Sequence, residues 1–132
     1  KLYKNTNEKS AQFGKWYARA SVTNNLDLDG LAAHMATHNS PYSKGVIRGV
    51  LTDMITCIKE LVLDGKGVKL DDLAIFSVGI KTTPADSPSE STAKDNVTGY
   101  RLRARATGDL SPSSFKLDVQ LKEADSYDVE KE

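Results

Sequence analysis

The sequence has little cysteine, little histidine, no net charge and no long hydrophobic run. Its 132 residues include one cysteine and two histidines, and 18 basic residues balance 18 acidic ones. A single cysteine excludes an internal disulfide, and we expect Cys57 to be a buried packing residue because it lies near the apolar side of a helix. No apolar run approaches the roughly 18 residues of a membrane helix, so no membrane partner is expected.

The scarcity of reactive groups also limits chemistry. No nucleophile with a base, phosphate-binding glycine loop or pair of carboxylates stands out, so the sequence predicts no enzyme, no cofactor and no small-molecule substrate. His34 and His38 are four residues apart, a spacing that can chelate a metal ion on a helix. No third ligand accompanies them, and we expect an exposed pair rather than a metal site.

The charges that are present are unevenly distributed along the chain. Residues 1–22 carry five basic residues and one acidic residue, whereas residues 109–132 carry three and seven. Residues 81–108 carry five basic and three acidic residues. A local basic surface can therefore exist on a neutral protein.

The length is sufficient for one domain with one core. We predict a single domain over residues 1–132 with five parts. In order, these are an N-terminal β-hairpin (1–26), a helical pair with the first strands (27–80), a flexible arm (81–99), a return strand with C-terminal elements (100–124) and an acidic tail (125–132).

Strand-forming residues dominate the N-terminal part. Lys15–Val22 alternates so that Trp16 and Ala18 share one face, and Leu2–Lys4 is its expected partner across a polar turn. The aromatic residues here favour packing over a base-stacking platform.

Two helices are predicted next. Asp27 can cap a helix that continues through Met35, and Asn39-Ser40-Pro41 ends it. Ser43 can cap a second helix over Lys44–Leu63. That helix has an apolar stripe too wide for one short helix and a small sheet to cover, which predicts packing against a second copy of the chain. The expected dimer-interface residues are Val46, Val50, Leu51, Met54, Ile58 and Phe76.

Strands follow the helices. Val68–Leu70 and Leu73–Ile80 are expected strands, and Thr82–Asn96 is an expected flexible loop of polar and small residues. The sequence from Tyr100 to Ala106 alternates strictly and predicts another strand. A short helix at Leu110–Phe115 and a strand at Phe115–Lys122 complete the expected order.

Three arginines are the leading functional candidates. Arg101, Arg103 and Arg105 would stand on one face of a strand, separated by roughly 6.5–7 Å, close to the phosphate spacing along a DNA strand. The alternative is a solvated face on which these arginines meet acidic residues of the next strand. Lys81 and Lys94 would add basic groups on the arm.

The arm also contains Pro84 and Pro88. An apolar side chain at the tip of a β-arm can wedge between base pairs and kink DNA. Nearby acidic residues, Asp86 and Glu90, would repel phosphates, which favours an uninvolved flexible loop.

The order of these elements resembles the bacterial histone-like HU/IHF family. The matching segments are Leu31–Met35 as helix one, Ser43-Lys44 opening helix two, Gly65–Leu70 as turn and first strand, Asp72–Val78 as the next strand, and Tyr100–Gly108 as the returning arm. The closest similarity is to the variant subgroup with added N- and C-terminal strands. Two family glycines are replaced, by Asp72 and Ala74, and the family's arm-tip Arg-Asn-Pro is missing.

The resemblance implies an α+β fold, an HU/IHF-like intertwined dimer with two helices, an antiparallel sheet and an extended β-arm, plus an N-terminal hairpin and a C-terminal strand. It implies sequence-nonspecific binding of double-stranded DNA by a homodimer in the bacterial cytoplasm, at the nucleoid. Lys81, Lys94, Arg101, Arg103 and Arg105 would contact the DNA. The alternative is an HU-fold dimerisation or protein-interaction module with weak or no DNA binding, which the zero net charge and acidic tail favour.

Overall fold

The computed structural model describes residues 2–120. In chain order, the elements are β1 (Leu2–Lys4), β2 (Trp16–Ala18), α1 (Leu28–Ala36), α2 (Lys44–Leu63), β3 (Val68–Leu70), β4 (Ala74–Thr82), α3 (Ala93–Asn96), β5 (Val97–Ala106), the 3-10 helix η1 (Gly108–Leu110) and α4 (Pro112–Asp118). The chain divides into two compact units. One is Leu28–Val119, and the other contains the β1–β2 hairpin.

Helix α2 has the bounds that the sequence predicts, because both of its ends are closed by local hydrogen bonds. The Ser43 side chain accepts a hydrogen bond from the backbone N–H of Val46, at 3.3 Å, and so satisfies a free donor of the first turn. At the other end, Gly65 has a φ of 82°. Its N–H donates to the carbonyl of Val62, and that of Lys66 donates to the carbonyl of Leu61, both at 3.0 Å. These two bonds form a Schellman motif, which ends the helix.

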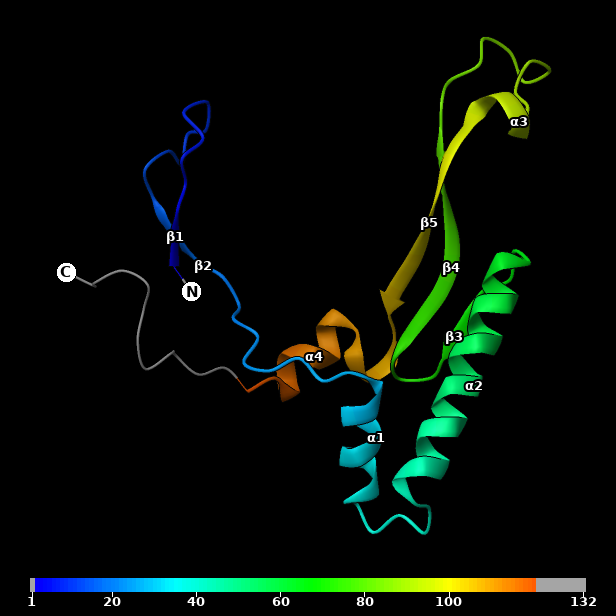
Figure 1. Ribbon diagram of the computed structural model, residues 1–132. Coiled ribbons are helices and arrows are strands. Elements are labelled where there is room, and N and C mark those ends of the chain that lie inside the picture. The colour runs from blue at the N-terminus through cyan, green and yellow to red at the C-terminus, as the bar shows by residue number, and fades with distance from the viewer. Residues whose placement is uncertain (1, 121–132) are drawn as a thin grey trace. The chain divides into compact units, whose positions relative to one another are not determined.

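The Leu28–Val119 unit contains a three-stranded antiparallel sheet in the order β3-β4-β5. β4 and β5 pair from Ala74 with Ala106 to Thr82 with Val97, with an irregularity between Lys81 and Thr82. Figure 1 shows these two strands as a long ribbon, with α3 at its far end and α2 beside the short β3. The sheet therefore extends into an arm, as predicted.

Few side chains of the described residues are buried. The buried hydrophobic residues are Ala32, Ile47 and Val62, with exposed fractions of 0%, 6% and 5%. Ala32 and Ile47 come from the two paired helices, α1 and α2, whereas Val62 lies at the end of α2 that faces the sheet. Much of the apolar surface of α2 and of the sheet is left accessible in the single chain.

A tight junction holds the base of the arm. Asp72, in the turn between β3 and β4, has a φ of 60°, and Gly108, just after β5, has a φ of 58°. The Asp72 carboxylate accepts a hydrogen bond from the N–H of Asp109, at 3.3 Å, and the N–H of Thr107 donates to the carbonyl of Leu73, at 3.1 Å. Both bonds join the end of β5 to the turn that begins β4.

The hairpin of the other unit forms as predicted, but its second strand is shorter. β1 and β2 pair antiparallel, with Leu2 opposite Ala18 and Lys4 opposite Trp16. Trp16 and Ala18 therefore share a face, as the alternation indicated. Regular pairing ends at Ala18 instead of continuing to Val22.

The predicted strand at Phe115–Lys122 is wrong over the described residues that it shares with α4. Pro112 stands in the first turn of that helix, where its missing N–H and fixed φ are favourable. The N–H of Phe115 donates to the carbonyl of Ser111, at 2.8 Å, which closes the first helical turn. The end of the predicted strand and the acidic tail at 125–132 lie outside the described residues.

Two further expectations need correction. Cys57 is exposed in the single chain rather than buried, because it lies on a part of α2 that neither α1 nor the sheet covers. The Thr82–Asn96 segment was expected to lack regular structure. It contains the short helix α3, with Thr92 as its N-cap.

Candidate nucleic-acid interface

The arginine row consists of Arg101, Arg103 and Arg105 on β5. Successive residues of a strand point to opposite faces, so these three side chains share one face of the sheet. All three are exposed. The opposite face carries Tyr100 and Leu102, which border an apolar groove against α2. Arg103 and Arg105 therefore lie on the face of the sheet away from α2, whereas Arg101 also borders the groove.

The cross-strand neighbours of the arginine row are uncharged. Arg101 pairs with Gly79, Arg103 with Ser77 and Arg105 with Ile75. The alternative in which the arginines meet acidic residues on the next strand is therefore wrong for β4. Within residues 2–120, no ion pair involves an arginine of the row.

Gly79 shapes the middle of this face. A Cβ atom at Gly79 would lie 2.8 Å from Cδ and 2.9 Å from Cγ of Arg103, and 3.1 Å from Cγ of Arg101. These distances are too short for van der Waals contact, so the two arginine stems occupy the space that any larger residue would need. Sequence reasoning missed Gly79, since its role depends on the cross-strand register.

The two predicted lysines lie farther along the arm. Lys81 is on β4 opposite Gly99, two residues along the strand from Gly79, so it stands on the same face as the arginine row. Lys94 is in the last turn of α3. Lys69 on β3 pairs with Ile75 and extends this basic face at its other end, a residue that the sequence analysis did not single out. The strands thus bring Lys69, the arginine row and Lys81 together, and Lys94 stands apart on α3.

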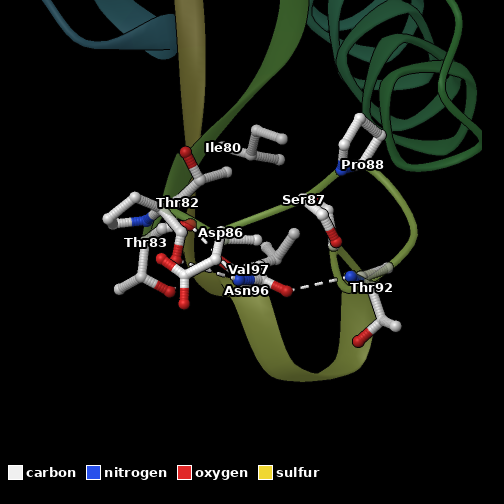
Figure 2. A pocket seen from close by; sticks show the side chains of 13 residues that line it. Ile80, Thr82, Thr83, Asp86, Ser87, Pro88, Thr92, Asn96 and Val97 are labelled. Carbon is white, nitrogen blue, oxygen red and sulfur yellow. Dashed lines mark hydrogen bonds between the residues drawn. The ribbon is translucent and has the colours of Figure 1, made fainter.

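The tip of the arm is a closed loop organised by Asn96. Its side-chain oxygen accepts a hydrogen bond from the N–H of Thr92, at 2.9 Å, and its amide nitrogen donates to the carbonyls of Thr83 and Pro84, each at 3.4 Å. The N–H of Thr83 also donates to the carbonyl of Asn96, at 2.8 Å. Figure 2 shows Asn96 near the centre of this loop, with its bond to Thr92.

Both predicted arm-tip prolines belong to this loop. Pro84 and Pro88 border a hollow of about 510 Å³, together with Asp86 and Asn96. Pro84 is also tied to the loop through its carbonyl. The loop therefore holds both prolines beside an acidic residue.

The expected dimer-interface residues fall into two groups. Met54, Ile58 and Phe76 line an apolar groove of about 560 Å³ between α2 and the sheet, which Tyr100 and Leu102 also border. Farther toward the start of α2, Val46 and Val50 are 51% and 63% exposed, and Leu51 is half-buried. Leu102 is 65% exposed. It was not among the predicted interface residues, because the alternating pattern of β5 was interpreted mainly through its arginines.

The histidine pair is exposed at the end of α1. Nε2 of His34 and Nε2 of His38 lie 3.0 Å apart, and the rings meet edge to face. Among the described residues, no group of three or more histidine, cysteine or acidic side chains could hold a metal ion. In the same part of the chain, no helix is long and apolar enough to cross a membrane.

A solved structure with a similar fold was found. It is a chain of an HU–DNA cocrystal structure from Anabaena (AHU2), with a TM-score of 0.50 and 19% sequence identity. The match covers 70% of this chain and 98% of that chain. The search of curated proteins found no match.

The sequence itself matches a protein family over residues 1–122. That family is described as an HU domain fused to a winged helix-turn-helix, Ig or glycine-rich motif (HU-HIG). The match covers most of the chain, and it includes the β1–β2 hairpin as well as the Leu28–Val119 unit. It agrees with the helical pair, the antiparallel sheet and the arm described above, and it confirms the resemblance on which the sequence analysis relied. The chain belongs to the HU-HIG family and has the HU fold.

Proposed function

We propose that this chain binds double-stranded DNA without sequence specificity, as a homodimer, through the arginine row and the arm. Binding would be to the phosphate backbone, because the guanidinium groups of the row have a spacing that suits phosphates, and phosphate contacts carry no sequence information. Lys81 and Lys94 would add contacts along the arm. An architectural role at the bacterial nucleoid follows from this chemistry.

One observation carries the proposal. The arginine row is exposed on an extended strand, and its neighbours across the sheet are Gly79, Ser77 and Ile75 rather than acidic residues. Alternate residues of a strand are roughly 6.5–7 Å apart, which is close to the spacing of successive phosphates along one DNA strand. The row can therefore contact consecutive phosphates without a change in the backbone.

The homodimer is supported by the apolar surface of the Leu28–Val119 unit. Tyr100 is 76% exposed and Leu102 65%, and both border the groove between α2 and the sheet. Exposed apolar patches of this kind mark protein interfaces. A second copy that inserts its own apolar residues would cover the groove and leave Arg103 and Arg105 on the opposite face of the sheet.

Fluorescence anisotropy with a labelled duplex of random sequence tests the proposal. The triple variant R101A/R103A/R105A should weaken binding by at least about 10-fold, since each charge-assisted contact to phosphate is worth on the order of 1 kcal/mol. The matched control, R48A/K66A/K116A, removes the same charge outside the arginine row and outside the groove, and it should bind within about twofold of the wild type. Equal loss in both triple variants would overturn the proposed site.

A second candidate function is an HU-fold interaction module that does not bind DNA. Asp86, Glu90 and Asp95 on the arm favour it, since they would repel phosphates. It predicts that the wild type shows no binding to the duplex at low salt, whereas dimerisation is retained.

A further inference from the structure

The β1–β2 hairpin is basic and carries exposed aromatic residues. Its described residues 2–22 include Lys4, Lys9, Lys15 and Arg19 against a single acidic residue, Glu8. Phe13 and Trp16 are 55% and 51% exposed. Both rings are therefore about half accessible in this unit, whereas Tyr17 packs against Tyr3 as expected.

One face of the hairpin is held by its own aromatic contacts. The rings of Tyr3 and Tyr17 face each other across the strands, with centroids 5.7 Å apart. The Arg19 guanidinium lies 3.7 Å from the centroid of the Tyr3 ring, a cation–π contact. These contacts hold the two strands together, and they occupy the tyrosine face with side chains of the hairpin itself.

The other face presents Trp16. Lys4 lies opposite Trp16 in the strand register, and its ammonium group is 5.9 Å from the centroid of the indole ring. The exposed half of the indole is open to a second flat, apolar group. A cation beside an exposed indole suits an anionic ligand that also carries a ring, because one group neutralises charge while the other stacks.

The turn that carries Phe13 is ordered by backbone bonds. The N–H of Asn5 donates to the carbonyl of Lys15, and the N–H of Gly14 donates to the carbonyl of Asn5, both at 2.9 Å. Gly14 has a φ of 80°, which a residue with a side chain would rarely adopt. Phe13 is therefore presented from a fixed turn, so stacking on it would cost little ordering of the chain.

We propose that this hairpin binds single-stranded DNA, with unpaired bases stacked on Trp16 and Phe13 and phosphates contacted by Lys4, Lys9 and Lys15. A duplex hides the faces of its bases inside the stack, whereas a single strand exposes them to aromatic side chains. This second site goes beyond the proposed binding of duplex DNA by the arm. It would let the protein hold unpaired stretches as well as paired ones.

The fluorescence of Trp16 tests the hairpin directly, since it is the only tryptophan in the sequence. Titration of the full chain with a short oligo(dT) should quench its emission. The variant K4Q/K9Q/K15Q should weaken the affinity by about 10-fold, and raising the salt should weaken that of the wild type. In R101A/R103A/R105A, oligo(dT) should still quench the emission of Trp16, because this readout reports on the hairpin itself.

Anisotropy of labelled oligo(dT) provides a second readout. Trp16→Ala should reduce affinity by about 10-fold, whereas Trp16→Phe, which keeps an aromatic ring, should restore most of it. Emission unchanged at saturating oligo(dT) would overturn the proposal. Blue-shifted emission that oligo(dT) does not alter would do so too, because it would show that Trp16 is buried against protein. If the wild type binds the duplex but its Trp16 emission does not respond to oligo(dT), the hairpin site alone is refuted. If oligo(dT) quenches Trp16 but the wild type does not bind the duplex, the arm site alone is refuted.

Discussion

Gly79 is the residue that gives the arginine row its room. Because Arg101 and Arg103 lay their stems over it, a methyl group there would meet carbon atoms of both side chains at 2.8–3.1 Å. Gly79→Ala should displace the row and weaken duplex binding by roughly fivefold, on the order of 1 kcal/mol, while the fold is retained. Anisotropy measures the affinity, and circular dichroism measures the fold.

Gly99→Ala is the matched control, since its Cβ would be 3.7 Å from Cβ of Lys81, an ordinary contact. Equal affinity of the two variants would show that Gly79 has no such role.

Gly108 has both a positive φ and no free space. A Cβ atom there would lie 2.7 Å from Cα of Asp72, and the φ of 58° adds conformational strain. Gly108→Ala should therefore lower the free energy of unfolding by about 2–4 kcal/mol. Gly65 also has a positive φ, 82°, but nothing lies within 4 Å of a Cβ added there. Gly65→Ala should therefore lower the free energy of unfolding by only about 1 kcal/mol. Urea denaturation compares them, and equal losses would contradict a steric junction at Asp72.

At the residue scale, the sequence showed which residues are unusual for the family, but it did not show which apolar positions are buried within one chain. The resemblance placed Asp72 where the HU/IHF family has glycine. The structure explains the replacement, because aspartate tolerates the positive φ and its carboxylate accepts the N–H of Asp109. Cys57 was expected in the core because it lies near the apolar side of α2. A stripe alone does not distinguish the side that packs within the chain from the side left open to a partner.

At the scale of elements, an ion pair ties α1 to the start of α2. Nζ of Lys44 lies 2.9 Å from Oδ2 of Asp29, and Nε of Arg48 lies 3.9 Å from Oδ1. The hydrogen bond and the charge of Lys44 lower the pKa of Asp29 from its ordinary value of 3.8, with a smaller contribution from Arg48. The stability that this pair adds is therefore fully present above pH 3.8 and is lost as the pH falls through the lower, folded-state pKa of Asp29.

An NMR titration of the side-chain carboxyl carbons tests this tie between the helices. The Asp29 midpoint should lie below 3.8 in the wild type and should move up toward it in Lys44→Gln. Lys59→Gln, on α2 but not paired with Asp29, should leave the midpoint unchanged. The same midpoint in the wild type and in Lys44→Gln would show that the pair seen in the structure does not persist in solution.

The elements differ in how far the sequence predicted them. Helix α2 was predicted with its bounds, since apolar periodicity, the Ser43 cap and the Gly65 stop all agree. The strand expected at Phe115–Lys122 was not, because Phe115 and Val119 fit both an alternating pattern and a four-residue helical spacing. Pro112 then decides for the helix. The closed arm tip could not be predicted, since it depends on bonds from Asn96 to residues on both sides of the loop.

At the scale of the whole molecule, the open groove in the Leu28–Val119 unit is the main structural argument for a dimer. A charge at Leu102 would be placed among Met54, Phe76 and other apolar residues of the groove. The wild type is expected to be a dimer of 14.4 kDa chains. Leu102→Glu should raise the Kd for dissociation of the dimer by at least about 10-fold. Sedimentation equilibrium measures this shift. Tyr42→Glu, at a residue that is 61% exposed and outside the groove, should leave the dimer intact. A wild type that is monomeric at micromolar concentration would contradict the proposal.

The central claim is that the arginine row holds duplex DNA by its phosphates. Its most direct test is the slope of log affinity against log salt concentration, because each phosphate contact contributes close to one unit to that slope. The wild type should show a steep negative slope, and R101A/R103A/R105A a slope shallower by about two to three units per chain that contacts the DNA. An identical slope in the two proteins, or a wild-type slope near zero, would contradict the account.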